Sequence, residues 1–491
     1  MKSYVIAVDQ STSATKALLF NEDGMLLNNV SIAHRQYYPR EGWVEHDPEE
    51  IYANTVKSIR EVVTGYDGEF SLALTNQRET VVAWERATGR PVCNAVVWQC
   101  LRGKDICDRL KTEGWSELVK ERSGLLIDPY FAGSGAKWIL DNVEGVREAA
   151  VRGELCMGTV DSWLIFRLTG GKVHATDYTN ASRTMLFNIH TLDWDDDLLG
   201  MLTIPRSMMP EPRPSDAGYG ETTVEGLFPE LIRIAGVLGD SHGALAGQMC
   251  FAEGLGKVTY GTGSSVMVNI GERPSDPPEG LVTSVGFAAL GKVFYAFEGN
   301  IHCTGATIAW LKDELRLIDS PSEIEAIATS VESNGGVYFI PAFAGLAAPW
   351  WHSEVKAQIC GLTLGSGRAQ VCRAALESIG YQVKDLVDAM VGSAGISLRE
   401  LRVDGGPTKN RFLMQFQADL LGVPIVRSEV EDACAYGAFI MNGFARRKWK
   451  SFEEAAEHWS RVGDWSPQSG NEARVASDYA GWREAVSQLI K

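Results

Sequence analysis

Short apolar runs separated by turn residues open the chain. Residues 4–8 and 14–20 are largely apolar, and residues 21–24 supply Asn, Asp and Gly before a third run at 25–30. Runs of this length, bounded by turn-forming residues, are typical of β-strands joined in hairpins. We therefore expect the chain to begin with short strands connected by tight turns.

A helix is predicted directly after these strands. Asp47 can cap its first turn, Pro48 suits the first helical position, and Glu50 completes a pattern similar to a capping box. The apolar positions that follow recur near one helical face, which we expect to be buried. That face would carry Ile51, Thr55, Ile59 and Val62.

The same order of elements begins again near the middle of the chain. Strands are predicted first at 71–74, 80–84 and 92–98, and then at 234–238, 257–261, 264–270 and 401–403, with helices at 303–317 and 410–421. The repetition predicts two α/β domains that meet near residue 248. We expect an N-terminal domain of residues 1–248 and a C-terminal domain of residues 249–491.

Composition narrows the class of protein. The 491 residues carry 46 Lys and Arg against 63 Asp and Glu, a formal net charge of −17. A nucleic-acid-binding protein needs basic surface to displace counterions from phosphates, so this balance argues against one. No apolar stretch is long enough to span a membrane, and the N-terminus does not resemble a signal peptide. We expect a cytoplasmic protein that binds neither nucleic acid nor membranes.

The pattern of the nine cysteines is consistent with a cytoplasmic protein. They are scattered, odd in number, and form no CxxC pair. This pattern favours reduced thiols over a disulfide framework or a zinc site.

Three polar turns, each at the end of an apolar strand, are the first candidate site. The common nucleotide motifs, GxxxxGK[ST] and GxGxxG, are absent. The turns can nevertheless direct backbone N–H groups and hydroxyls at phosphate oxygens, and Asp9 in the first could hold magnesium. They comprise residues 9–13, 261–264 and 404–406.

A fourth motif allows two interpretations. Residues 239–243 read GDSHG and match the GxSxG nucleophile elbow of α/β-hydrolases, with Ser241 as nucleophile. A serine hydrolase would then need a later histidine, His302, His352 or His458, to complete its triad. In a kinase, Asp240 would instead be the catalytic base and Ser241 part of the pocket wall. The motif by itself leaves both interpretations open.

Taken together, these stretches resemble the FGGY carbohydrate kinases, and among them most closely the glycerol kinases. The resemblance covers nearly the whole chain. Its strongest segments are residues 42–48 (GWVEHDP), 75–80 (TNQRET), 94–100 (NAVVWQC), 176–188 (TDYTNASRTMLFN), 261–263 (GTG) and 404–417. It implies two α/β domains of the actin/hexokinase-like (ribonuclease H-like) type, which flank a nucleotide cleft.

The resemblance also implies an activity. The protein would use ATP and Mg²⁺ to phosphorylate a terminal hydroxyl of a small neutral polyol or ketose. It would form a homo-oligomer, a dimer or tetramer. By position, Asp240 would be the general base, and Arg78, Glu79, Trp98, Tyr130, Ser241 and Ser265 would line the substrate pocket. The nucleotide side would comprise Thr12, Ser13, Lys16, Gly261, Thr262, Gly305, Ile308, Gly406 and Asn410, with Asp9 at the metal.

Departures from the glycerol kinase pattern affect the expected substrate. Ser241 stands where glycerol kinases have Gln, and Ser265 where they have a Phe that packs over glycerol. Both changes enlarge the pocket and make it more polar, which favours a substrate of four or five carbons, with glycerol itself the alternative. Ala309, Pro407 and Ser11 also depart from the pattern, on the nucleotide side. Residues 224–234 lack the glycine-rich loop through which some glycerol kinases sense fructose 1,6-bisphosphate.

One non-enzymatic class competes with these two enzyme classes. An actin-like or Hsp70-like nucleotide-binding module would also carry the three phosphate-type turns. It would have no use for a polyol pocket of Arg78, Glu79, Trp98 and Tyr130, which favours the kinase interpretation.

Overall fold

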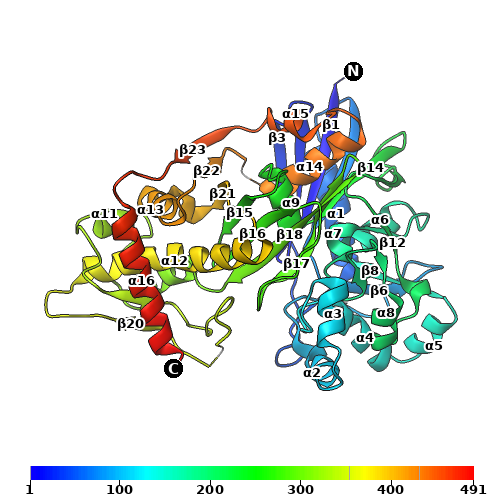
Figure 1. The fold of residues 1–491 in the computed structure, drawn as a ribbon. Coiled ribbons are helices and arrows are strands. Elements are labelled where there is room, and N and C mark those ends of the chain that lie inside the picture. The colour runs from blue at the N-terminus through cyan, green and yellow to red at the C-terminus, as the bar shows by residue number, and fades with distance from the viewer. Residues whose placement is uncertain (1, 353, 431) are drawn as a thin grey trace.

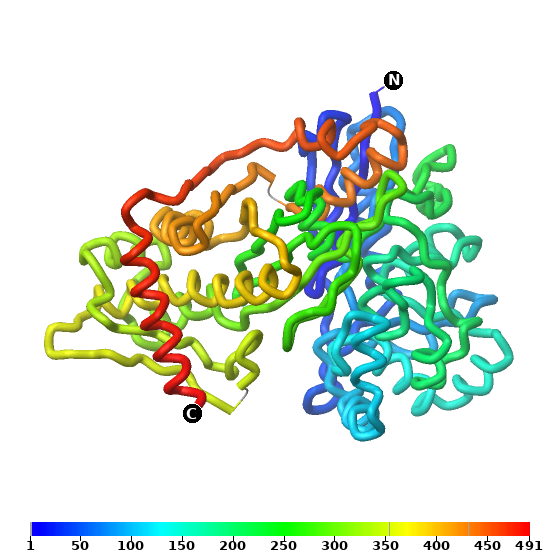
Figure 2. The backbone as a smooth tube through the Cα atoms, viewed as in Figure 1, coloured from blue at the N-terminus to red at the C-terminus, as the bar shows by residue number. Residues whose placement is uncertain are grey.

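Two mixed β-sheets, each covered by helices, dominate the molecule (Figure 1). The computed structural model describes residues 2–352, 354–430 and 432–491. In the smoothed backbone, the N-terminal half of the chain occupies one side of the molecule and most of the C-terminal half the other (Figure 2). This two-part α/β arrangement confirms the predicted fold class.

The N-terminal sheet has six strands in the order β13-β14-β5-β1-β2-β3. Strands β1, β5 and β14 run parallel, so their carboxyl ends meet at one edge. Strands β1, β2 and β3 form the antiparallel meander expected from the opening apolar runs. The strands are β1 (Ser3–Gln10), β2 (Ala14–Asn21), β3 (Leu26–Ala33), β5 (Glu69–Asn76), β13 (Gly218–Thr222) and β14 (Ile232–Gly239).

Both faces of this sheet are buried, because side chains alternate between two cores. Ile6 and Val8 pack in the core beneath α1 (Pro48–Val62) and α6 (Val160–Leu168). Val5 and Ala7 pack in the other core, beneath α9 (Asp240–Gly247) and α14 (Ala433–Ala445).

Two local predictions in this half need correction. Helix α1 starts as expected, with the Asp47 side chain accepting from the N–H of Glu49. Glu50 does not complete a capping box, because its carboxylate accepts from the backbone N–H of Arg35 instead. The strand expected at 92–98 shrinks to β7 (Ala95–Val96), and the N–H of Val97 beyond it donates to the carbonyl of Val44.

A smaller sheet and several helices extend the N-terminal half and form one wall of the central cavity. The sheet has the order β4-β7-β6-β8. Its strands are β4 (Glu45–His46), β6 (Val81–Glu85), β7 and β8 (Leu155–Thr159). The accompanying elements are η1 (Leu101–Gly103), α2 (Lys104–Thr112), α3 (Ser116–Ser123), α4 (Ala132–Asn142), α5 (Val146–Val151), β9 (Ala175–Asp177), α7 (Tyr178–Ala181), β10 (Phe187–Asn188), β11 (Asp193–Trp194), α8 (Asp196–Leu202), η2 (Arg206–Met208) and β12 (Glu211–Arg213).

The C-terminal sheet has seven strands in the order β17-β18-β16-β15-β21-β22-β23. Strands β15 and β21 run parallel, so the turns that follow them are neighbours. The strands are β15 (Leu255–Tyr260), β16 (Ser264–Gly271), β17 (Val282–Ala289), β18 (Lys292–Ile301), β21 (Glu400–Gly405), β22 (Ile425–Ser428) and β23 (Arg461–Trp465).

The two faces of the C-terminal sheet differ in chemistry. Val258, Val266 and Val403 pack into a core with the long helix α12 (Arg368–Ala394) and with α13 (Arg411–Leu421). The opposite face carries Thr259 and Ser265, which line the cavity. The remaining elements are α10 (Gly305–Asp313), α11 (Ile324–Ala328), β19 (Tyr338–Ile340), β20 (Gln358–Cys360), η3 (Gly406–Lys409), α15 (Phe452–Ala456) and α16 (Glu472–Leu489).

Helix α14 connects the two halves. It lies late in the chain, yet it packs against α9 and the N-terminal sheet (Figure 1). Asn442 on α14 donates to the carbonyl of Ala235 and accepts from Ser71, which fixes the helix over β5 and β14. The domain boundary near residue 248 remains a prediction. Helix α14 follows that boundary in sequence but packs on the sheet formed by residues that precede it.

Candidate active site

Parallel strands place the predicted site residues at one edge of the N-terminal sheet. Asp9 lies near the end of β1, Arg78 and Glu79 follow β5, and Asp240 follows β14. Residues far apart in sequence therefore converge where the carboxyl ends of these strands meet.

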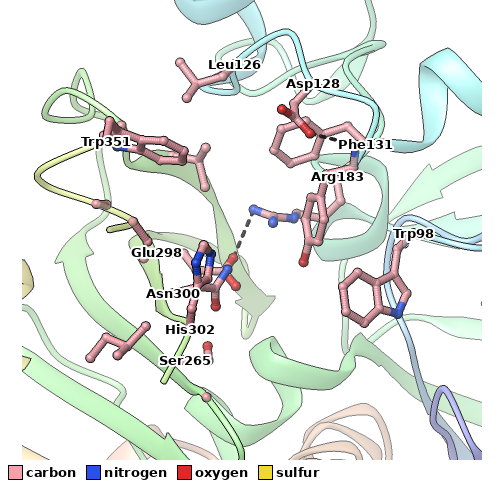
Figure 3. Close-up of a pocket in the computed structure, with 18 of the residues that line it drawn as sticks. Trp98, Leu126, Asp128, Phe131, Arg183, Ser265, Glu298, Asn300, His302 and Trp351 are labelled. Atoms are coloured by element: carbon pink, nitrogen blue, oxygen red, sulfur yellow. Dashed lines mark hydrogen bonds and ion pairs between the residues drawn. The ribbon is translucent and has the colours of Figure 1, made fainter. Parts of the chain in front are cut away.

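A buried cluster of opposite charges forms the base of the site. Arg78 donates to both carboxylate oxygens of Glu298, at 2.7 and 2.8 Å. Arg183 donates to Glu79 at 2.6 Å and lies 3.0 Å from Glu298 (Figure 3). These four side chains are at most 5% exposed. Burial alone would raise the pKa of Glu298, but Arg183 and Arg78 hold that pKa well below its usual value.

Asp240 faces this cluster and remains accessible. Its carboxylate lies 3.0 Å from Nε of Arg78, and its side chain is 32% exposed. The preceding residue, Gly239, has no room for a Cβ, which would lie 2.5 Å from the Arg78 side chain. The Gly239 N–H donates to the hydroxyl of Thr179 at 2.8 Å. The backbone before Asp240 is thus held in place, while its carboxylate remains accessible to a ligand.

Aromatic side chains form the facing wall. The rings of Trp98 and Tyr130 meet edge to face, with centroids 5.6 Å apart. The Trp98 indole donates to the hydroxyl of Thr12 at 3.0 Å, which connects this wall to the first polar turn. Burial is the main cause that raises the pKa of Tyr130. Its phenol therefore stays protonated and can donate a hydrogen bond.

A cavity of about 970 Å³ lies between this wall and the C-terminal sheet. Glu298, Asn300, His302 and Ser265 line one side of it, and Trp98 and Arg183 lie opposite (Figure 3). Ser265 and Asn300 are paired across β16 and β18, so their side chains share a face of the sheet. The cavity has polar side chains within a mainly apolar lining, and it has space for more than a three-carbon ligand.

The geometry around Ser241 does not support a hydrolase. Its hydroxyl accepts from Arg78 at 3.1 Å, and among the described residues no histidine forms a hydrogen bond with it. The adjacent His242 bonds instead with the Ser284 hydroxyl, at 2.9 Å. A GxSxG nucleophile needs a base within hydrogen-bond reach, so Ser241 is better described as part of the pocket wall.

The second and third polar turns lie side by side. Tyr260 pairs with Gly405, whose φ is 94°, and a Cβ on Gly405 would lie 1.9 Å from the Tyr260 carbonyl oxygen. Gly305 also joins the second turn, because its N–H donates to the carbonyl of Gly261. Within the part of the chain that the structure describes, the N–H groups of Thr262 and Gly263 form no hydrogen bond. They are available to phosphate oxygens.

The other residues predicted on the nucleotide side surround these turns. Gly406 is exposed at the start of η3, and Asn410 caps α13 by accepting from the N–H of Leu413. Ile308 is only 8% exposed, and its side chain belongs to the hydrophobic core. A nucleotide could contact Ile308 only through the small exposed part of its surface.

Asp9 is suited to a metal ion. Asp9 is 4% exposed, and among the described residues its Oδ1 has no hydrogen-bond partner. Lys16 lies 3.6 Å from Asp9 and 2.9 Å from Asp432. Burial, and then the charge of Asp432, raise the pKa of Asp9 to about 8, although Lys16 opposes this. An unpartnered buried carboxylate oxygen fits magnesium, which takes few protein ligands and completes its shell with water and phosphate oxygens.

The described residues lack two further kinds of feature. They contain no group of three or more His, Cys, Asp or Glu side chains arranged to hold a metal. They also contain no helix long and apolar enough to cross a membrane. All nine cysteines are free thiols, as expected.

Three charged residues of the site were not predicted from the sequence. Arg183 and Glu298 complete the buried cluster, and Lys257 lies beneath Ser265. A signal was present for two of them, because Lys257 is the single charge of β15 and Glu298 interrupts the apolar run of β18. Arg183 lies inside the segment 176–188, whose resemblance to a family had indicated its importance.

The fold and the cleft define a two-domain phosphotransferase that acts on an alcohol group. Comparison with known proteins identifies the family. The model described as "FGGY family of carbohydrate kinases, N-terminal domain" matches residues 4–247, and the corresponding C-terminal model matches residues 256–446. The chain belongs to the FGGY family of carbohydrate kinases.

Curated relatives are similar over their full length. Glycerol kinase 1 of Thermotoga maritima is 49% identical over 491 residues, and glycerol kinase of Bacillus cytotoxicus is 46% identical over 490, with 99% of each chain covered. Among solved structures, Plasmodium falciparum glycerol kinase with ADP has a TM-score of 0.95 at 32% identity, covering 100% of this chain and 99% of that one. Xylulose kinase from Lactobacillus acidophilus has a TM-score of 0.88 at 20% identity, covering 99% and 98%, and shows the same fold.

Proposed function

We propose that the protein transfers the γ-phosphate of ATP to a terminal hydroxyl of a small neutral polyol or ketose, with a preference for four or five carbons. The observation that supports this preference is a group of polar side chains on one side of the cavity. Ser265, Asn300 and His302 line it together, and Ser265 takes the place of the Phe that covers glycerol in the glycerol kinases. A longer substrate could extend its additional hydroxyls through the space that the small Ser265 side chain leaves, toward Asn300 and His302.

The charge of the site supports a neutral substrate. The guanidinium groups of Arg78 and Arg183 are already paired with carboxylates, those of Glu79, Asp240 and Glu298. Neither arginine is therefore left to neutralise an anionic substrate, whereas a polyol offers only hydroxyls that donate and accept.

Arg78 supports this site mainly by holding other residues. Its three nitrogens already face Glu298, Asp240, Ser241 and His242. Arg78 thereby orients Asp240, the proposed general base, which would accept the hydroxyl proton as the substrate oxygen attacks the γ-phosphorus. Glu79 and Tyr130 would hold neighbouring hydroxyls, and closure of the cleft would exclude water.

ATP and Mg²⁺ are the proposed cosubstrate and metal. The phosphates would bind between the first turn, with Thr12, Ser13 and Lys16, and the free N–H groups of the second. Asp9 would contribute to holding Mg²⁺, which neutralises phosphate charge when bound. We also propose a homodimer or homotetramer, which light scattering coupled to size-exclusion chromatography would test.

The test is a coupled ADP-release assay that compares kcat/KM for glycerol, dihydroxyacetone, erythritol, threitol, erythrulose, xylitol, xylulose and ribulose. We expect a four- or five-carbon compound to exceed glycerol by about tenfold, a ratio that one or two polar contacts can produce. Ser265→Phe should then restore preference for glycerol, and Lys137→Met, remote from the cavity, should not.

Glycerol is the second candidate substrate. The specific observation in its favour is the 46–49% identity to curated glycerol kinases over the full chain. If glycerol exceeds every longer compound in the same assay, the preference for four or five carbons is wrong, while the phosphotransferase class stands.

A further inference from the structure

A buried lysine lies beneath the cavity wall and has no ion-pair partner among the described residues. Lys257, on β15, is 0% exposed. Its ammonium donates to the hydroxyls of Ser265 at 3.2 Å and Thr259 at 3.3 Å. No carboxylate oxygen of the described residues lies within 4.0 Å of it.

This arrangement is costly for the fold alone. A buried cation without a contacting anion loses its hydration, and hydroxyl acceptors replace only part of it. Burial accordingly lowers the pKa of Lys257, although the more distant Asp404 opposes this. A methionine of similar length would fill the same space without that cost, so the charge points to a role in function.

The direction of the hydrogen bonds suggests that role. An ammonium group can only donate, so the Ser265 oxygen accepts from Lys257 and keeps its own proton to donate elsewhere. Among the described residues that proton has no acceptor, and Ser265 lines the cavity. The N–H groups of Thr262 and Gly263, also without partners in the described chain, belong to the turn that immediately precedes Ser265.

We propose that Lys257 and Ser265 add a hydroxyl donor and a buried positive charge to the phosphate site already proposed at the turn 261–263, and that they act on the phosphoryl group in transit. Ser265 would donate directly to a phosphoryl oxygen. Lys257 would act as a positioning residue that orients and polarises this hydroxyl and supplies positive charge beneath it. The proposal rests on the phosphotransferase activity and does not depend on which polyol is the acceptor.

The chemistry balances without a further reactant. The bond from the substrate oxygen to the γ-phosphorus forms, and the bond from phosphorus to the bridging oxygen of ADP breaks. The hydroxyl proton passes to Asp240, and ADP leaves with the electron pair. Negative charge on the three phosphoryl oxygens must be stabilised throughout, which fixed donors and a nearby cation can do.

The test compares ligands that differ only in the γ-phosphate. Calorimetry would measure the Kd of the non-hydrolysable ATP analogue AMP-PNP and of ADP, each with Mg²⁺, for the wild type, Lys257→Met and Ser265→Ala. We expect the Kd of AMP-PNP to rise about tenfold in both variants and that of ADP to change less than twofold. With the best acceptor, kcat should fall about 100-fold in Lys257→Met.

Lys137→Met is the matched control. Lys137 is also buried, at 7% exposure, but it pairs with Asp141 at 2.9 Å, remote from the cavity. This variant should bind both nucleotides as the wild type does.

Three results would overturn the proposal: unchanged AMP-PNP affinity, an equal loss of AMP-PNP and ADP affinity, or a loss confined to the polyol. Lys257→Met should fold at least as stably as the wild type, because it removes an unpaired buried charge. If it does not fold, Ser265→Ala decides the question, since it alters a half-buried side chain. If no polyol or ketose proved to be an acceptor, the Kd values of AMP-PNP and ADP could still be measured, so the proposal would still be tested.

Discussion

The indole Nε1 of Trp98 donates to the hydroxyl of Thr12 at 3.0 Å, and this hydrogen bond connects the substrate wall to the first phosphate-type turn. Trp98 also contacts Tyr130 edge to face. A substrate that displaces the indole would therefore shift a group expected to face the nucleotide. The two binding events should be energetically coupled through this contact.

Trp98→Phe is predicted to weaken that coupling. The variant keeps an aromatic face toward Tyr130 but loses the hydrogen bond to Thr12, worth about 1 kcal/mol or about fivefold in affinity. Initial-rate measurements should show KM rising for both polyol and ATP. Trp84→Phe is the control, because the Trp84 indole is buried without a hydrogen-bond partner. A KM change for polyol alone would show that Trp98 acts only on the substrate.

Asp240→Asn is predicted to remove the general base. We expect kcat to fall about 10³-fold, within the usual range for such a group, and KM for the polyol to stay within about threefold. The neighbouring Ser241→Ala should retain kcat, and a fluorophosphonate probe should not label Ser241. Labelling, together with inactivation by Ser241→Ala, would instead support the hydrolase interpretation.

The requirement for magnesium should depend on pH through Asp9. Burial and Asp432 raise the pKa of Asp9 to about 8, so below this pH a proton competes with the metal. Protonation weakens binding as pH falls, and apparent affinity for Mg²⁺ should rise from pH 7 to about 8.5 and then level off. Kinetic titrations of Mg²⁺ at fixed ATP would measure this. Asp9→Asn should bind Mg²⁺ weakly at every pH, whereas a retained pH dependence would assign it to another group.

Stability should depend on pH through Asp385, a carboxylate buried in the C-terminal half. It accepts from Trp350 at 3.1 Å, Tyr479 at 2.6 Å and Trp482 at 2.9 Å. Burial outweighs these donors and raises its pKa from 3.8 to about 6. The folded state therefore holds this proton more tightly than the unfolded state. Protonation of Asp385 therefore stabilises the folded state by about 3 kcal/mol. This contribution is fully present below pH 3.8 and is lost as pH rises through 6.

Urea unfolding at pH 5 and pH 8 would test whether the free energy of unfolding falls as pH rises. Asp385→Asn keeps a polar group facing all three donors and does not titrate, so its unfolding midpoint should vary less with pH than that of the wild type. Asp388→Asn, on the same helix but in the surface pair with Lys384, is the control and should change little. Equal pH slopes in the wild type and Asp385→Asn would exclude Asp385 as the source.

The sequence was sufficient wherever a local rule controls the structure. Short apolar runs and turn residues predicted β1, β2 and β3, and the Asp47-Pro48 pair predicted the start of α1. The strand-end turns of Asp, Thr and Gly could be recognised because their chemistry lies within a few consecutive residues, and their binding of phosphate stays a prediction. The segment resemblances gave the family, which the matches over both domains confirm.

Only the tertiary structure decided how distant charges are paired. Glu298 lies 220 residues after Arg78 in the chain, yet both of its oxygens accept from that guanidinium. Glu50 and the residues around β7 departed from local expectation because contacts with Arg35 and Val44 outweighed it. The position of helix α14 could not be predicted locally either. Its apolar side chains are buried against the N-terminal sheet and α9, a surface that exists only once the chain has folded. Local propensity acts over a few residues, whereas burial and charge pairing depend on the complete fold.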